Sequence, residues 1–185
     1  MLEKRLAGVQ TLSGTGACRL AADFYAKFLP TGTKVYCSDP TWPNHIPIFG
    51  QAGFDVCKYS YLDRATNRLD LDGMLADLKS APDGSIIVLH ACAHNPTGVD
   101  PTAADWDKIS ALAKDKGHHL LVDMAYQGFA SGDADADALA LRKLVKDGHS
   151  LLLAQSFAKN FGLYGERVGT LSVVCGDAEE AARVQ

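Results

Sequence analysis

The amino-acid sequence predicts an α/β fold in which helices cover both faces of a mainly parallel sheet. Several apolar runs have the length of strands and are continuous rather than alternating, which is typical of parallel strands buried on both faces. Segments with apolar residues at helical spacing lie between these runs. Strands that alternate with helices form parallel units, and 185 residues are enough for one domain with a sizeable core.

Strands are predicted where apolar and β-branched residues cluster between turn residues. Four strong candidates are 34–38, 85–93, 119–125 and 150–156, and two weaker ones are 54–61 and 169–175. Helices are predicted at 16–29, 70–81, 102–117 and 135–148. The first helix ends before Pro30, because proline does not continue a helix. The last two end in Lys-Gly and Asp-Gly, where glycine accommodates the left-handed conformation that often terminates a helix.

The composition is that of an ordinary globular protein, with 47% hydrophobic and 22% charged residues. A net charge of −4 gives no reason to expect nucleic acid or an anionic membrane as a partner. No apolar run approaches the roughly 20 residues of a membrane span, and the first residues lack the apolar core of a signal peptide. Five cysteines occur singly, which indicates reduced thiols and a soluble, cytoplasmic protein: Cys18, Cys37, Cys57, Cys92 and Cys175.

Ligands of open α/β sheets bind outside the carboxyl ends of the strands, so candidate residues are sought after each apolar run. The stretch SGTGA, residues 13–17, comes just before the first long predicted helix, where glycines and a helix N-terminus favour an anion. A plain tight turn explains this stretch equally well. Trp42 follows the next strand in a proline-bounded loop, either as a packing anchor or as a stacking surface.

The stretch HACAHNPTG, residues 90–98, offers two interpretations. His90, Cys92 and His94 alternate along one predicted strand, so a metal site has to be considered. We predict no metal, because no fourth ligand has suitable spacing and such residues on buried strands are usually structural. Asn95 begins a proline-initiated turn that would hold its amide at the edge of the sheet.

Two ionisable residues follow buried strands where water is scarce. Asp123 comes directly after a Leu-Leu-Val run and needs a cationic partner or several donors, although a carboxylate that caps a neighbouring helix is the simpler interpretation. Tyr126 follows with a phenol. Lys159 comes just after the run 150–156, and lysine is almost never fully buried unless it is paired. Arg167 and Ser156 flank this lysine and could complete an anion site.

These residues match the needs of one cofactor, pyridoxal phosphate. Its phosphate needs backbone donors, a hydroxyl and an arginine, and its ring needs a stacking face. Its pyridine nitrogen needs a carboxylate, and its aldehyde needs a lysine amine. Desolvation lowers the pKa of a lysine and frees its amine for imine formation, which would explain a lysine at the end of a buried strand.

The same segments resemble the large domain of class I aminotransferases, in particular the aspartate aminotransferase family. They span residues 13–169 in the order typical of that family: SGTGA, PTWPNH, HACAHNPTG, VDMAYQGF and QSFAKNFGLYGERVG. The last segment is long and highly specific, whereas SGTGA alone would not suffice. The resemblance implies the fold-type I architecture of pyridoxal-phosphate enzymes, with a seven-stranded, mainly parallel sheet.

The resemblance also implies a role for each matching residue. Lys159 would hold the cofactor through a covalent imine and then move the proton during transamination. Asp123 would pair with the pyridinium nitrogen, while Tyr126 and Asn95 would donate hydrogen bonds to the 3′-oxygen of the ring. Trp42 would stack on the ring, and Trp42 and Asn95 would border the substrate. The phosphate would be bound by Gly14, Thr15, Ser156 and Arg167. His45 and His90 would support Asp123, although each is equally plausible as an ordinary polar core residue.

The implied activity is transfer of the amino group of L-aspartate to 2-oxoglutarate by a homodimer, and a mitochondrial form stays open. In the family, further segments precede SGTGA and a small domain follows the region at Gln185. We therefore expect residues 1–185 to be a partial large domain that has little or no activity alone. A non-catalytic binding domain and an NAD-type oxidoreductase are the alternatives. The second is weakened because SGTGA lacks the third glycine of G-x-G-x-x-G.

Overall fold

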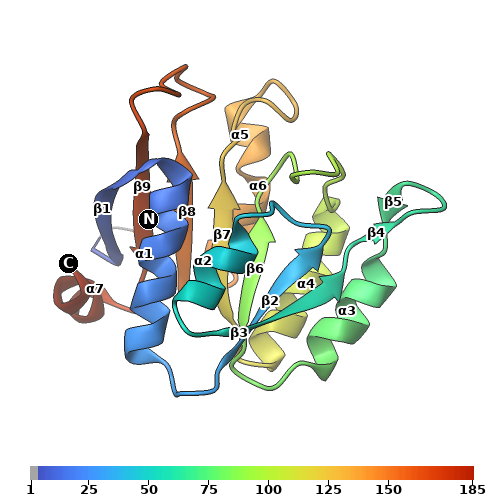
Figure 1. The fold of residues 1–185 in the computed structure, drawn as a ribbon, viewed down its shortest axis with the longest axis horizontal. Helices are drawn as coiled ribbons and strands as arrows, with labels where there is room; N and C mark the ends of the chain where they lie inside the picture. Colours follow the sequence, from blue (N-terminus) through green and yellow to red (C-terminus); the bar gives the residue numbers. More distant parts are fainter. Residues whose placement is uncertain (1–3) are drawn as a thin grey trace.

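The protein, described here by a computed structural model over residues 4–185, is built around a seven-stranded sheet with the order β1-β9-β8-β7-β6-β2-β3 (Figure 1). Residues 1–3 of the predicted domain lie outside the described residues. The strands of this sheet are β1 (Leu6–Leu12), β2 (Lys34–Asp39), β3 (Asp55–Ser60), β6 (Ile86–His90), β7 (His119–Met124), β8 (Leu151–Ser156) and β9 (Val168–Val174). Five neighbouring strands, from β8 to β3, run parallel, and β9 and β1 pair antiparallel at one side. The predicted mainly parallel sheet is confirmed.

Helices cover both faces of the sheet, as predicted. They are α1 (Ser13–Phe28), α2 (His45–Gln51), α3 (Leu71–Ser80), α4 (Ala103–Asp115), α5 (Ala134–Asp137), α6 (Leu139–Lys146) and α7 (Ala178–Val184). On one face α1 and α2 pack against Ile86 and Val88, and on the other α3, α4 and α6 pack against Ile87 and Leu89. Because side chains alternate along a strand, each continuous apolar run supplies both cores. A small hairpin, β4 (Leu62–Asp63) with β5 (Arg68–Leu69), projects from the sheet (Figure 1).

Some predicted boundaries were wrong. The strand predicted at 85–93 ends at His90, because Ala93 adopts a left-handed backbone conformation (φ 47°) and the chain turns. The helix predicted at 135–148 is two helices, α5 and α6, with a break at Ala138. The first helix begins at Ser13 rather than at residue 16, so SGTGA forms its first turn instead of preceding it.

Five elements were not predicted: β1, α2, α7 and the two-residue strands β4 and β5, which are too short to show a pattern. β1 carries Gly8 and polar residues and pairs with only one neighbour, so it lacks the apolar pattern of a buried strand. α2 contains Pro47 and Gly50, which are poor helix formers. α7 is short and mostly exposed. Over residues 4–185, no helix is long and apolar enough to cross a membrane.

Gly169 is the tightest point between β9 and the start of α1. A Cβ atom there would lie 2.5 Å from the carbonyl carbon of Ser13 and 2.6 Å from the carbonyl oxygen of Gln155. Because backbone atoms cannot rotate away, Gly169→Ala is expected to lower the free energy of unfolding by about 1–3 kcal/mol, measured by urea denaturation. Gly165→Ala is the matched control, since a Cβ atom added at Gly165 would meet nothing within 4 Å. Equal losses in the two variants would contradict this packing argument.

Candidate functional site

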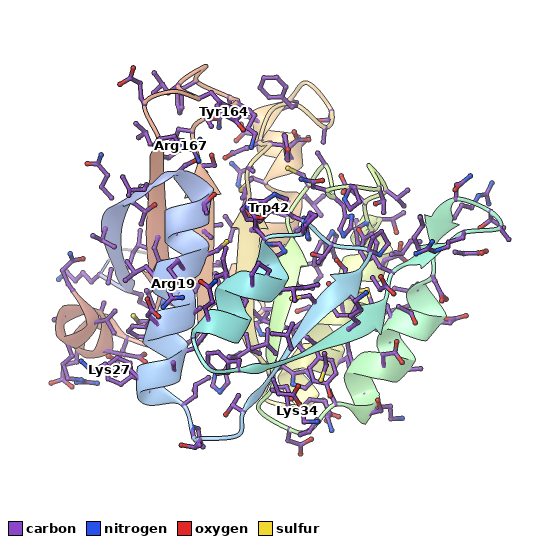
Figure 2. All side chains as sticks on the ribbon, viewed as in Figure 1. Arg19, Lys27, Lys34, Trp42, Tyr164 and Arg167 are labelled. Carbon is purple, nitrogen blue, oxygen red and sulfur yellow. The ribbon has the colours of Figure 1, made fainter. Side chains whose placement is uncertain are left out.

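A cavity of about 360 Å³ lies at the carboxyl ends of β6, β7 and β8, beside the first turn of α1. Its volume is within the usual range for small-molecule sites, about 300–1,000 Å³. Figure 2 labels three of its residues, Trp42, Tyr164 and Arg167, at the end of the molecule toward which β7 and β8 point. The lining residues are Ser13, Gly14, Thr15, Trp42, His90, Cys92, Asn95, Asp123, Ala125, Tyr126, Ser156, Lys159, Tyr164 and Arg167. All nine residues predicted to bind a cofactor are therefore in one cavity.

One end of the cavity is suited to an anion. The first turn of α1 has no side-chain cap and no acidic residue, so the backbone N–H groups of Gly14 and Thr15 are available to a ligand. Arg167 lines the same region, and its carbonyl oxygen accepts a hydrogen bond from the Ser13 N–H (2.9 Å). The hydroxyls of Ser13 and Ser156 are 2.8 Å apart. A guanidinium, two hydroxyls and a helix N-terminus together form a strong binding site for a phosphate group.

A buried carboxylate lies deeper in the cavity. Asp123 is 8% exposed and its Oδ2 atom is 2.9 Å from Nε2 of His45, which is fully buried. The other ring nitrogen of His45 is 2.9 Å from the Thr41 hydroxyl, which lies 3.2 Å from Nε2 of His90. Burial lowers the pKa of His90 well below its usual value, with a further contribution from neighbouring histidines. This chain fixes the orientation of the carboxylate. His45 supports Asp123 without lining the cavity, and Asp123 does not cap a helix.

Lys159 lines the cavity, three residues after β8 ends. Its Nζ atom lies 4.7 Å from the centre of the Tyr126 ring and 5.7 Å from that of Tyr164. The sequence predicted a buried lysine, and this was wrong: Lys159 is half-buried and lines the cavity. A lysine amine held against aromatic rings inside a cavity can reach a bound carbonyl compound.

Trp42 and Asn95 border the cavity from two loops. The Trp42 ring packs edge-on against the His45 ring at 5.2 Å while also lining the cavity, so it serves as a packing anchor and remains available for stacking. Asn95 lies in the turn after β6. The proposed alternation of His90, Cys92 and His94 along one strand was wrong, because β6 ends at His90. Burial and nearby carboxylates raise the pKa of Cys92 to about 12, so this thiol is not a thiolate.

His94 holds the turn that carries Asn95, a role the sequence did not indicate. Its Nε2 atom lies 2.9 Å from the Ser38 hydroxyl and its Nδ1 atom 2.8 Å from the Thr97 hydroxyl. Its ring stacks on Tyr61 with a centroid distance of 3.8 Å. Ser13, Thr41 and Tyr164 were also missed as members or supports of the site. All three lie in the recognised segments, but spacing alone does not give the direction of a side chain.

Acid is expected to destabilise the protein through His94. Burial, with a smaller effect of His45, lowers the pKa of His94 to about 4 from 6.5. Between these two values the unfolded chain binds the proton and the folded chain does not. The free energy of unfolding should therefore fall as the pH drops from 6.5 toward 4, by up to about 1.4 kcal/mol per pH unit. Urea denaturation across this range should give a flatter slope for His94→Gln. An unchanged slope would contradict this assignment.

Comparisons with known proteins show the family. The family model for aminotransferase class I and II matches residues 2–185. The mitochondrial aspartate aminotransferase of Schizosaccharomyces pombe is 58% identical over 184 residues, which cover all of this chain and 42% of that protein. Matching relatives include proteins named for the mitochondrion and for the cytoplasm. The chain thus spans less than half the length of these curated relatives.

Solved structures give the same result for the fold. A mitochondrial aspartate aminotransferase from Trypanosoma brucei superposes with a TM-score of 0.94 at 50% identity, covering 97% of this chain and 47% of that one. An aromatic-amino-acid aminotransferase from Burkholderia pseudomallei, described as covalently bound to pyridoxal phosphate, gives a TM-score of 0.94 at 45% identity, covering 97% of this chain and 45% of that one.

Proposed function

The chain belongs to the aminotransferase class I and II family, and we propose that it forms the cofactor-binding large domain of a pyridoxal-phosphate-dependent aspartate aminotransferase. The proposed reaction transfers the amino group of L-aspartate to 2-oxoglutarate. The observation that carries the proposal is the convergence, in one cavity, of an amine, a buried carboxylate and an anion site.

The residues present fit this cofactor at each of its functional groups. The uncapped start of α1, Ser156 and Arg167 would hold its phosphate. A Cβ at Gly14 would lie 3.2 Å from the Cβ of Ser156, so a side chain there would crowd the anion site. Asp123 would face the ring nitrogen, and Tyr126 and Asn95 would donate to the ring oxygen. When bound, pyridoxal phosphate supplies an electron sink for the α-carbon of the amino acid.

The chain's own residues would bind, orient and move a proton. Lys159 would hold the cofactor covalently and, once displaced by the substrate amine, carry a proton on Nζ within the cavity. Asp123, fixed by His45, would keep a negative charge against the ring nitrogen at no cost of reorganisation. Trp42 would stack on the ring and limit access of water from its side of the cavity.

The substrate part of the proposal predicts a slow reaction for the 185-residue chain tested alone. A dicarboxylic substrate is best bound by one arginine at each carboxylate. Within residues 4–185, Arg167 is the only arginine that lines the cavity, and we assign it to the cofactor phosphate. Substrate carboxylates would then be bound by groups from outside this cavity wall, which is consistent with the proposed homodimer. Similar proteins are named for aspartate and for aromatic amino acids, so both kinds of amino acid are candidate substrates.

The structure disfavours the NAD-type alternative. In a dinucleotide-binding unit the glycine-rich turn follows a parallel strand. Here SGTGA follows β1, which pairs antiparallel with β9. The test is a titration with pyridoxal phosphate and, separately, NAD, followed by addition of L-aspartate and analysis of the oxo-acid product. We expect saturable binding of pyridoxal phosphate by this chain and at most slow formation of oxaloacetate, because the groups that would bind the substrate carboxylates lie outside this cavity wall. Binding of NAD alone would contradict the proposal. Cofactor binding without product, both in this chain and in a longer protein that contains it, would favour the non-catalytic domain.

A further inference from the structure

Cys18 is a buried thiol beside the carboxylate of the proposed cofactor site, and none of the roles assigned above uses it. It lies on α1, one turn after Gly14, and is fully buried. Its Sγ atom, a ring nitrogen of His45 and a carboxylate oxygen of Asp123 all lie within 4.8 Å of one another. The three side chains come from α1, α2 and β7, so the fold brings them together.

We propose that Cys18, His45 and Asp123 form a binding site for a thiophilic divalent cation such as Zn²⁺ in the cofactor-free protein. Cysteine sulfur, imidazole nitrogen and carboxylate oxygen are the ordinary ligands of zinc. Three protein ligands leave a fourth position for water, as in zinc sites that remain open. Because Asp123 lines the cavity, this fourth position and the entry path both lie on the cavity side.

The distances and charges of the cluster suit such an ion. Nε2 of His45 and Oδ2 of Asp123 are already 2.9 Å apart. Zinc–ligand bonds of about 2.0–2.3 Å place the ligand atoms of a tetrahedral site roughly 3.5 Å apart. The His45–Asp123 pair therefore has to open by about half an ångström, and the sulfur, which lies within 4.8 Å of both atoms, has to approach by about 1 Å at most. A thiolate and a carboxylate together cancel the charge of a divalent cation. The occupied site would then carry no net charge, which limits the cost of burying the ion.

The surroundings of His45 also fit a metal ligand. A ligating histidine usually donates its other ring N–H to a hydrogen-bond acceptor, which fixes the ring. Nδ1 of His45 lies 2.9 Å from the Thr41 hydroxyl, whose oxygen can accept the ring proton. With Nε2 bound to the cation, the single ring proton of His45 would reside on Nδ1 and be donated to Thr41.

Binding would release one proton to the solvent. Burial and the charge of Asp123 raise the pKa of the Cys18 thiol well above its usual value, so the thiol is protonated before the cation arrives. The S–H bond breaks as the metal–sulfur bond forms, and the proton passes to a water molecule. The cation exchanges three of its water ligands for the three side chains. No oxidation or reduction occurs.

The site implies competition between the cation and the cofactor. Asp123 is the carboxylate that we assign to the pyridine nitrogen, so this consequence rests on the proposed function. One carboxylate cannot serve a buried divalent cation and a protonated ring nitrogen in the same place. By linkage, each ligand would lower the affinity of the other by the same factor.

Co²⁺ is the probe for the site, because a cobalt–thiolate bond gives a charge-transfer absorption band in the near ultraviolet. Titration of the cofactor-free protein should produce this band with one equivalent of Co²⁺. Cys18→Ser keeps the volume of the side chain but should lose the band and bind Co²⁺ more than about tenfold more weakly. Cys92→Ser is the matched control, since Cys92 lines the same cavity outside the cluster and its loss should leave the band unchanged.

Circular dichroism is used to check that Cys18→Ser is folded. If it is not, Cys18→Ala takes its place in the titration. A wild-type protein without the band, or a band that depends on Cys92, would overturn the proposal. The band should also disappear when pyridoxal phosphate saturates the unmodified protein. If Co²⁺ and pyridoxal phosphate bound together at full occupancy, the claim that both use the Asp123 carboxylate would be wrong. A Cys18-dependent band in a protein that binds no pyridoxal phosphate would support the cation site and refute the proposed function instead.

Discussion

Replacing Asp123 with asparagine is expected to leave the cofactor bound but to lower the rate of amino-group transfer by about 10²–10³. Asparagine has nearly the same shape as aspartate and can accept a hydrogen bond from His45, so the cavity should keep its form. The fixed negative charge beside the ring nitrogen is lost, and in a water-poor site such a charge is worth far more than in water. The rate is measured as single-turnover conversion of the cofactor-loaded protein by L-aspartate.

A second buried carboxylate provides the control for this change. Asp137 is 6% exposed and accepts hydrogen bonds from the N–H groups of Gly128, Ala130 and Ser131, but it does not line the cavity. Asp137→Asn should reduce stability without a comparable loss of rate in the fraction that remains folded. If Asp123→Asn transferred the amino group at the wild-type rate, the carboxylate would be a polar core residue and its proposed role would be wrong.

Replacing Lys159 with alanine is expected to lower the same rate by about 10²–10⁴, because the group that moves the proton is removed. The phosphate-binding residues are unchanged, so pyridoxal phosphate should still bind, though no longer covalently. Visible absorbance and equilibrium dialysis report the link and the affinity separately. Lys58→Ala is the control, since Lys58 is exposed and pairs with Asp39 away from the cavity. Equal losses in the two variants would contradict a specific role for Lys159.

The fold could be predicted where burial dictates the sequence. Strands β6, β7 and β8 are buried on both faces, so they require continuous apolar runs, and these were recognised. Strand β1 lies at the edge and α2 contains a proline and a glycine, so tertiary contacts rather than local sequence determine them. The start of α1 is likewise fixed by contact with the residue before β9, because the Ser13 N–H donates to the Arg167 carbonyl.

The candidate site could be predicted from the sequence to about the same extent as the fold. Residues at the ends of neighbouring parallel strands must converge, so Asp123 and Lys159 could be assigned to one sheet edge before the structure was known. Contacts that depend on the direction of a side chain could not be predicted. Thr41 between two histidines, His94 between Ser38 and Thr97, and Cys18 beside Asp123 all belong to this group. Each joins elements that are far apart in the sequence.

The central claim is that this cavity holds pyridoxal phosphate on Lys159, and reductive trapping tests it most directly. Borohydride converts a reversible link between an amine and an aldehyde into a stable secondary amine. The protein is incubated with an equimolar amount of pyridoxal phosphate, reduced, digested and mapped by mass spectrometry. We expect one labelled peptide with the modification on Lys159, and no such peptide from Lys159→Ala. Label spread over exposed lysines such as Lys58, with the same pattern in Lys159→Ala, would contradict the account.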